Sequence, residues 1–324
     1  MRKLPRFFSQ QISRLFPVSS LFKITTPAFL PFYHVVSNQN LPHIQNYYYR
    51  NTAQFEKELD FYLKHFTPVP LEYLVEHPHS KEKIFHLSFD DGLKECAEII
   101  APLLLKKGIP ATFFVNTDFV GNKTLFHKYK ASLILTELKK IPHTQAKKIL
   151  KDTGFAIENI LQISILQTPV LEKIGQLLSI DFESFLETEK PYVSREQLLI
   201  LKDDGFSIGA HSCNHPEFWK IPADEQLEQV QKSMDWVTKN IQPKIKAFAF
   251  PFTDDGVSLP VLETIKYNNI CDITFGTAGL KYDTFDFHRQ RYPVEMPGNF
   301  VQNIKTEWVY FFLRKQVGKA SVKH

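Results

Sequence analysis

The sequence predicts an α/β protein, because short apolar runs typical of buried strands alternate along the chain with longer stretches of helical periodicity. With 43% apolar residues, 29 Phe among them, the 324-residue chain can bury one large core or two modest ones. The expected strands are 29–36, 84–90, 111–116, 206–211, 246–251, 271–275 and 291–295. The expected helices cover 53–66, 93–107, 195–204, 223–241, 258–268 and 299–315.

Two adjacent carboxylates end the second of these strands. Residues 84–92 read Ile-Phe-His-Leu-Ser-Phe-Asp-Asp-Gly, an alternating strand-like run followed by a helical pattern. Because α/β folds place their chemistry at the C-terminal ends of strands, Asp90 and Asp91 can converge on one site, where one binds a metal and the other moves a proton. For this motif alone, a turn with an Asp that caps the helix is the simpler interpretation.

A later strand-like run ends in histidines. Residues 206–215 read Phe-Ser-Ile-Gly-Ala-His-Ser-Cys-Asn-His, so that His211 and His215 are separated by one turn of a helix and share one face. Two imidazoles and one carboxylate form a three-ligand set that leaves a position open for water, as in catalytic metal sites. The alternative is a pair of solvated histidines at a helix start, with Ser212 as the cap. The carboxylates at the other strand end favour metal binding.

A third strand-like run, from Ala247 to Phe252, stops at a proline turn. In order, the motifs Ser-Phe-Asp-Asp-Gly, His-Ser-Cys-Asn-His and Phe-Ala-Phe-Pro-Phe resemble those of the polysaccharide deacetylase family, carbohydrate esterase family four, with its NodB homology domain. The resemblance covers residues 29–118 and 196–296 and implies a distorted, incomplete (β/α) barrel of about seven strands. The pair Tyr33-His34 on the first strand is similar to the poly-N-acetylglucosamine deacetylase-like branch.

The resemblance implies a role for each motif residue. Asp90 is similar to the catalytic base of the family, and Asp91, His211 and His215 are similar to its metal ligands. Phe252 stands where the family has a tyrosine whose backbone N–H helps to form the oxyanion hole. A backbone donor does not depend on the side chain, so Phe252 can take this role.

The chain departs from the family pattern in two places. The third motif of the family opens with an arginine that orients the base, and this chain has Ala249 there. Arg291 is a candidate for a base-orienting or substrate-binding residue, with a solvated strand-end arginine as the alternative. The late Leu-x-x-His that supplies a general acid has no clean match, and His288 is the nearest candidate, with a surface histidine as the alternative. His34 is a candidate substrate-binding residue, or else a core or strand-end histidine.

These residues together support metal-assisted hydrolysis. A divalent metal on Asp91, His211 and His215 would lower the pKa of bound water from about 16 toward about 7, and Asp90 would take the proton. We therefore expect a metal-dependent hydrolase that removes an N-acetyl group from an amino-sugar polysaccharide or glycolipid, with Zn²⁺, or else Co²⁺ or Fe²⁺. The alternatives are a deacetylase-like protein that binds glycan without cleaving it, and a deacylase that acts on a non-glycan amide or ester.

Charge and periodicity divide the chain into three parts. Residues 1–28 form a basic amphipathic segment, and no acidic residue precedes Glu56. Residues 29–296 form the deacetylase-like catalytic domain, whose helical insertion at 119–195 packs over the rim as a lid or substrate wall, or else forms a separate helical satellite. Residues 297–324 form a C-terminal helix and a basic tail. The apolar residues of the first segment recur at helical spacing: Leu4, Phe7, Phe8, Ile12, Leu15 and Phe16.

The N-terminal segment and the composition also bear on partners and location. The segment can lie on an anionic membrane surface, or dock on the barrel. It lacks the unbroken apolar core of a secretory signal, so we expect a cytoplasmic protein or one that is peripheral at the inner face of the membrane. Nucleic-acid binding is not expected, because the basic excess is confined to one terminus. Three cysteines imply no disulfide framework.

Overall fold

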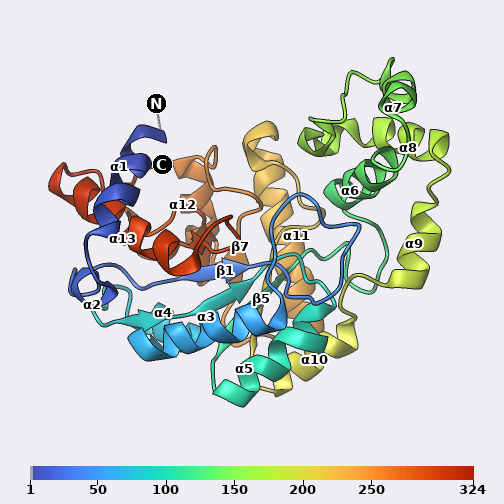
Figure 1. Ribbon diagram of the computed structural model, residues 1–324. Coiled ribbons are helices and arrows are strands. Elements are labelled where there is room, and N and C mark those ends of the chain that lie inside the picture. The colour runs from blue at the N-terminus through green and yellow to red at the C-terminus, as the bar shows by residue number, and fades with distance from the viewer. Residues whose placement is uncertain (1–2) are drawn as a thin grey trace.

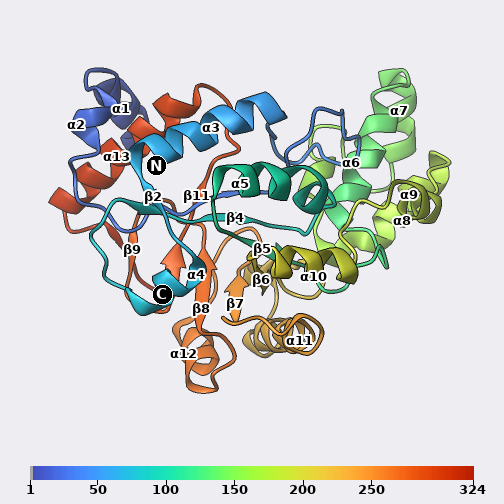
Figure 2. The ribbon, with the colours of Figure 1, turned by 90° about the horizontal axis from the view of Figure 1, so that it is seen from below.

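The protein is built around a parallel sheet of eight strands, in the order β10-β8-β7-β6-β5-β4-β1-β11. The computed structural model describes the backbone of residues 3–324 and the side chains from Arg6 onward. The sheet curves into a nearly closed barrel with helices around it (Figures 1 and 2). Its strands are β1 (Pro31–Tyr33), β4 (Leu87–Phe89), β5 (Ala111–Val115), β6 (Ser207–Ala210), β7 (Ala247–Ala249), β8 (Ile273–Gly276), β10 (His288–Gln290) and β11 (Tyr292–Pro293).

Helical crossovers connect most of these strands, as parallel pairing requires. Two small parallel pairs supplement the barrel, β2 (Thr67–Pro68) with β3 (Ile84–Phe85) and β9 (Tyr282–Asp283) with β12 (Ser321–Val322). The helices of the barrel are α3 (Thr52–His65), α4 (Leu71–Glu76), a π-helical turn (Cys96–Ile100) that continues as α5 (Ala101–Lys107), α10 (Arg195–Asp203), α11 (Ala223–Ile241), α12 (Leu259–Tyr267) and α13 (Phe300–Gln316).

The distorted, incomplete (β/α) barrel expected from the sequence is confirmed, with one strand more than expected. The extra strand is β10, which lies directly before the expected strand 291–295. Although β10 and β11 follow one another in sequence, β10 pairs with β8 and β11 pairs with β1. The chain therefore crosses the seam of the barrel at Arg291, whose backbone N–H donates to Gly276 on one side, while that of Tyr292 donates to Leu30 on the other.

The strands of the barrel are buried on both faces, as expected for a parallel sheet covered by helices. Phe89 and Phe113 stack at 5.3 Å in the layer between sheet and helices, whereas Phe114 and Phe275 meet at 5.5 Å within a second apolar cluster. The segment 84–89 is not the single alternating strand that the sequence predicts. It divides into β3 and β4, because β3 pairs with β2 while β4 joins the barrel.

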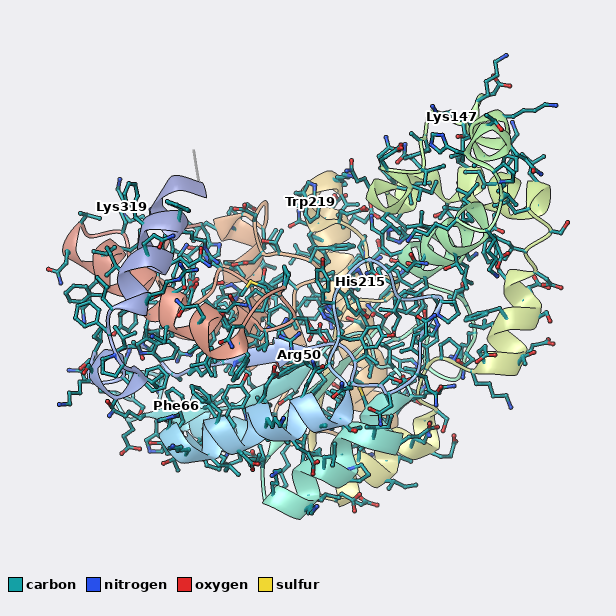
Figure 3. The ribbon with its side chains drawn as sticks, viewed as in Figure 1. Arg50, Phe66, Lys147, His215, Trp219 and Lys319 are labelled. Atoms are coloured by element: carbon teal, nitrogen blue, oxygen red, sulfur yellow. The ribbon has the colours of Figure 1, made fainter. Side chains whose placement is uncertain are left out.

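The insertion forms a helical lobe beside the barrel, green in Figure 1. It has an apolar core of its own, which extends to the loop after β1 through Leu41 and Ile44. Figure 3 shows Lys147 near the outer tip of this lobe. Its helices are α6 (His127–Leu138), α7 (His143–Leu150), α8 (Thr168–Leu177) and α9 (Phe182–Glu189), with two 3₁₀ turns at Ile160–Gln162 and Ile165–Gln167.

The N-terminal helix α1 (Lys3–Arg14) lies along α13 and is followed by the short α2 (Val18–Leu21). It docks through its small polar face: Ser9 and Ser13 are buried, and Ser13 Oγ accepts from Gln302 at 2.6 Å. Phe7 and Phe8 are more than half exposed. The Leu4 side chain lies outside the described residues. Contact of this face with a membrane remains a prediction, and among residues 3–324 no helix is both long and apolar enough to cross a bilayer.

Candidate active site

A cavity of about 320 Å³ lies at the C-terminal ends of the barrel strands. Its wall combines strand ends with part of the insertion, because Phe126, Lys128 and Leu161 line it together with the motif residues. Figure 3 shows His215 near the centre of the molecule, between the barrel and the insertion. Of the residues singled out in the sequence, the cavity is lined by His34, Asp90, Asp91, His211, His215 and Phe252, but not by His288 or Arg291.

Asp91, His211 and His215 present a set of atoms that fits a divalent metal ion. One ligand atom from each lies within 4.8 Å of the others, and Asp91 Oδ1 is 3.3 Å from His215 Nε2 and 3.8 Å from His211 Nε2. Asp91 Oδ1 is buried and accepts no hydrogen bond of regular geometry from the described residues, and an ion at this point would satisfy it. His211 Nδ1 lies 2.7 Å from the carbonyl oxygen of Ala249. With the proton on Nδ1, Nε2 keeps its lone pair for a metal.

The protonation states of these groups also suit metal binding, which requires neutral imidazole and ionised carboxylate. Burial lowers the pKa of His211 to about 4, although Asp90 acts in the opposite direction. Burial alone would raise the pKa of the Asp91 carboxyl. The close approach of His215, at 3.3 Å, outweighs that effect and holds the pKa of Asp91 well below its usual value. Near neutral pH Asp91 is therefore ionised and His211 is neutral, as metal binding by these two residues requires.

The histidine motif forms an irregular turn, so the helical turn expected from its spacing is wrong. Ser212 and His215 have φ values of 74° and 60°, in the left-handed region that a right-handed helix does not use. The backbone N–H of His215 donates to Ser212 Oγ at 3.0 Å, and this bond closes the turn. The two imidazole rings still meet, with centroids 4.8 Å apart.

The first and third motifs use the same backbone conformation. Asp91 has a φ of 72° and Phe252 a φ of 58°, and each costs on the order of 1–3 kcal/mol for a residue other than glycine. The neighbouring Gly92 also has a positive φ, of 65°. Glycine is favoured there for a second reason, since a Cβ would lie 2.9 Å from a side-chain carbon of Val115. Strain of this kind is typical of functional sites, where the surrounding structure holds a side chain in place.

Arg291 holds Asp90 from inside the barrel. Its two terminal nitrogens donate to the two carboxylate oxygens at 2.7 and 2.8 Å, and Nη1 also reaches Ser88 Oγ at 3.0 Å. The guanidinium is 1% exposed and lies 4.4 Å from the ring centroid of Phe32. The solvated strand-end arginine is therefore wrong. The geometry favours the base-orienting alternative over a substrate contact, because Arg291 does not line the cavity. Burial opposes the ionisation of Asp90, but the charge of Arg291 outweighs it and lowers the pKa of Asp90.

Two tyrosines that the sequence analysis did not single out hold Asp91. Tyr129, in the first turn of α6, donates to Asp91 Oδ2 at 2.9 Å. Tyr47, in the loop after β1, donates to the same oxygen at 3.4 Å, and the two hydroxyls lie 2.9 Å apart. The insertion therefore contributes directly to the candidate site. Tyr47 stands in a run of three tyrosines, and nothing in the sequence distinguishes it from its neighbours.

His34 lies across the cavity from the histidine motif and is paired with Glu295. Its Nδ1 is 2.5 Å from Glu295 Oε2, and its ring stacks on Tyr47 with centroids 4.2 Å apart. Glu295 is fixed in turn by the backbone N–H groups of His34 and Val35, at 3.1 and 3.3 Å. Burial lowers the pKa of His34, but the charge of Glu295 outweighs it and raises the pKa to about 9. His34 therefore presents a protonated imidazole to the cavity.

His288 is not brought to this cavity. It is fully buried in β10 and bonds to Thr274 Oγ1 at 2.8 Å and to Asp254 Oδ2 at 3.1 Å. Its interpretation as a surface histidine is therefore wrong, and its contacts do not point toward Asp90. A strand pairing that the sequence analysis missed is the reason, since β10 turns this side chain toward the loop after β7.

Phe252 places both its backbone and its ring at the cavity. No acceptor for the Phe252 N–H is found in the part of the chain that the structure describes, so this donor is free for a ligand. The ring packs at right angles against His215, with centroids 4.4 Å apart. The Phe252 carbonyl accepts from Thr277 Oγ1 at 3.1 Å, which fixes the orientation of the peptide.

A barrel with buried carboxylates and histidines gathered at its C-terminal rim has the architecture of an enzyme. The sequence profile of polysaccharide deacetylases matches residues 77–268, more than half of the chain, and the protein therefore belongs to the polysaccharide deacetylase family. This membership supports an enzyme that acts on an acetylated polysaccharide. No significant match to the sequence was found among curated proteins.

Solved structures share the fold at low sequence identity. The deacetylase PplD of Streptococcus pyogenes, in complex with acetate, is 15% identical, covers 88% of this chain and 99% of its own, and has a TM-score of 0.55. IcaB of Ammonifex degensii is 17% identical, with coverages of 88% and 97% and a TM-score of 0.56. The putative polysaccharide deacetylase BA0330 of Bacillus anthracis is 15% identical, with coverages of 87% and 69% and a TM-score of 0.52.

Proposed function

We propose that the protein is a metal-dependent hydrolase that removes N-acetyl groups from an amino-sugar polysaccharide or glycolipid. The observation that carries this proposal is the juxtaposition of Asp91, His211 and His215 with Asp90, whose Oδ2 lies 3.8 Å from His211 Nε2. When bound to these three residues, a divalent ion supplies a nucleophilic water at neutral pH and polarises the acyl carbonyl. Zn²⁺ suits an Asp-His-His set, and Co²⁺ and Fe²⁺ are the alternatives.

The groups around this set accept the proton of the water, stabilise the oxyanion and orient Asp91. Asp90 is kept ionised by Arg291 and accepts the proton of the attacking water. The backbone N–H of Phe252 is free to stabilise the oxyanion of the tetrahedral intermediate. Tyr129 and Tyr47 hold the second oxygen of Asp91, so that its Oδ1 faces the two histidines.

His34 is proposed as the general acid in place of His288. An amine leaves poorly unless it is protonated, and His34 carries a proton at the cavity wall near neutral pH because Glu295 raises its pKa. His288 has no access to the cavity. The pair formed by His34 and Glu295 thus supplies the function that the unmatched Leu-x-x-His motif has in the family.

The alternative of a protein that binds glycan without cleaving it rested on two missing residues. Arg291 and His34 offer both functions from other parts of the chain, which favours catalysis. The Phe126 and Leu161 side chains give one wall of the cavity an apolar surface. Lys128 also lines the cavity, and its Nζ donates to the carbonyl oxygens of Leu161 and Ile163. Because the family acts on acetylated polysaccharides, a short N-acetylglucosamine oligomer is the first substrate to test, and an aryl acetate ester tests the alternative of a non-glycan deacylase.

Replacing His211 by Ala should remove the metal of this site and the activity together, because the site loses one of its three ligands. The measurement is bound metal on protein purified without chelators, together with acetate release from N-acetylglucosamine oligomers with and without added Zn²⁺ or Co²⁺. Cys213→Ala is the matched control, since Cys213 lies in the same turn but contacts the carbonyl of Gln229 on α11. Full metal content and turnover in His211→Ala would show that the ligands have been assigned wrongly.

Replacing His34 by Gln should reduce amide hydrolysis by roughly 10²–10⁴-fold, the usual range for a general acid. Hydrolysis of an aryl ester should fall much less, because that leaving group departs without a proton. In the wild-type protein the protonated fraction of His34 decreases as the pH rises through its pKa, so activity falls on the alkaline side. A bound cation disfavours the protonated imidazole, so it moves this fall in activity to lower pH. Equal losses on amide and ester would assign His34 to substrate binding instead.

A further inference from the structure

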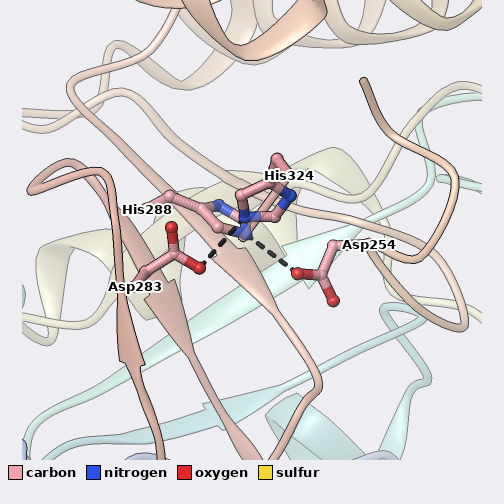
Figure 4. A group of neighbouring side chains, drawn as sticks. All are labelled: Asp254, Asp283, His288 and His324. Carbon is pink, nitrogen blue, oxygen red and sulfur yellow. Dashed lines mark hydrogen bonds and ion pairs between the residues drawn. The ribbon is translucent and has the colours of Figure 1, made fainter. Parts of the chain in front are cut away.

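A second cluster of metal-binding residues lies away from the candidate active site. Asp254, Asp283, His288 and His324 each offer one ligand atom within 4.8 Å of the others. Figure 4 shows the four side chains converging, with His288 directed at Asp254 and His324 at Asp283. Both of these nitrogen-to-oxygen distances are 3.1 Å. None of the four residues lines the cavity of Asp90 and Asp91.

The four residues come from four separate segments at the seam of the barrel. Asp254 lies in the loop after β7, Asp283 ends β9, His288 begins β10, and His324 follows β12. The pairing of β12 with β9 brings the chain from residue 321 onward to this place. A shared ligand here would connect the C-terminal segment to the barrel by bonds that the sheet itself does not provide.

Each carboxylate keeps one oxygen for the cluster. The Oδ1 atoms of Asp254 and Asp283 accept backbone N–H groups from Thr277 and Phe285, both at 3.1 Å, and their Oδ2 atoms face the histidines. Gln290 donates to both Oδ2 atoms, at 2.6 and 2.9 Å. Its amide is fixed in this orientation because its oxygen accepts the backbone N–H of Ala278 at 2.7 Å. Such supporting bonds orient the carboxylates of metal sites.

The two carboxylates of this cluster favour the binding of a cation. The two buried carboxylates carry two negative charges, and the imidazole rings of His288 and His324 are only 5.1 Å apart. One divalent ion among the four groups would neutralise both carboxylates and take its two nitrogen ligands from these rings. In tetrahedral zinc sites, with bonds of about 2.0–2.1 Å, neighbouring ligand atoms are about 3.3 Å apart, close to the two distances observed here.

We propose that Asp254, Asp283, His288 and His324 form a second, structural Zn²⁺ site. Two nitrogen and two carboxylate oxygen ligands complete a four-coordinate ion, so no position remains for a water or a substrate. The site has a consequence for the active site, because Asp254 follows Phe252 by two residues and Thr277 bonds to both. An ion on Asp254 would fix the loop that carries the oxyanion donor.

The test is the zinc content of the full chain after chelator treatment, reloading with ZnSO₄ alone and removal of the excess. Wild-type protein should hold about two ions per chain, and His324→Ala, Asp283→Asn and His211→Ala should hold about one each. The double variant His211→Ala, His324→Ala should hold none. His143→Ala is the control for loss of a histidine, since His143 is exposed on α7, and it should keep the wild-type content.

His211→Ala also separates this site from the proposed catalytic metal. If that variant binds no zinc, the second site is overturned, whatever the activity of the wild type. If it keeps its zinc and His324→Ala holds one ion fewer than the wild type, the second site is supported even where the proposed deacetylase activity fails. Asp283→Asn provides a second variant in case His324→Ala fails to fold. Added zinc should raise the thermal midpoint of His211→Ala, in which only the second site remains. It should not raise the midpoint of the double variant that combines Asp283→Asn with His211→Ala.

Discussion

Asp90→Asn is expected to keep its metal and to lose roughly 10²–10⁴-fold in turnover, the range that a general base contributes. The metal should remain because Asp90 does not belong to the group formed by Asp91, His211 and His215. Asparagine keeps the shape of the side chain and can still accept a hydrogen bond from Arg291. It cannot take the proton of the attacking water.

The measurement pairs metal content with the rate of acetate release at saturating substrate. Asp203→Asn is the control, since Asp203 is exposed at the end of α10, and it should leave both quantities unchanged. An Asp90→Asn protein that turns over at the wild-type rate would remove Asp90 from the role of base. Loss of the metal in this variant would instead make Asp90 a ligand.

Arg291→Lys is expected to lower turnover roughly 10- to 100-fold with little change in KM, because lysine cannot reproduce the bidentate contact that positions Asp90. It should also move the acid limb of the pH profile to higher pH. In the wild type the charge of Arg291 outweighs burial and lowers the pKa of Asp90. A weaker contact lets burial raise that pKa, so the base becomes protonated, and activity is lost, at a higher pH.

Arg291→Met tests the same contact through stability. It leaves a buried carboxylate without its partner, and breaking a buried ion pair in this way costs about 3–5 kcal/mol of unfolding free energy. Arg289→Lys is the matched control, because Arg289 lies two positions before Arg291, on β10, and does not line the cavity of Asp90. An acid limb that stays in place in Arg291→Lys would show that Arg291 supports the barrel without tuning Asp90.

The parts of the fold that could be predicted from the sequence are those that depend on local patterns. The apolar runs around Phe89 and Phe113 identify strands, and the periodicity of 223–241 identifies a helix, since burial on one face leaves a regular trace in the chain. The division at His86 could not be predicted. It depends on whether the neighbouring strand is β2 or β1, and pairing partners far apart in sequence leave no local pattern.

The candidate site could be predicted only where its residues stand together in a motif. Asp90 and Asp91, and His211 and His215, are close in sequence as well as in space. Tyr129 reaches Asp91 from 38 positions away, and Glu295 reaches His34 from 261 positions away. Only the closure of the barrel and the packing of the insertion bring such pairs together, so the sequence could name the candidate metal ligands but not the groups that hold and complement them.

The seam of the barrel bears on how divergent members of such a family are sorted in genome surveys. A search that scores the third motif would find Ala249 where it expects an arginine and would place this chain among the inactive members. The guanidinium is nevertheless present, 42 positions further along the chain, where the chain passes from β10 to β11 across the seam of the barrel. For these proteins a geometric criterion, an arginine within bidentate reach of the base, would classify the chain by its chemistry where the motif would not.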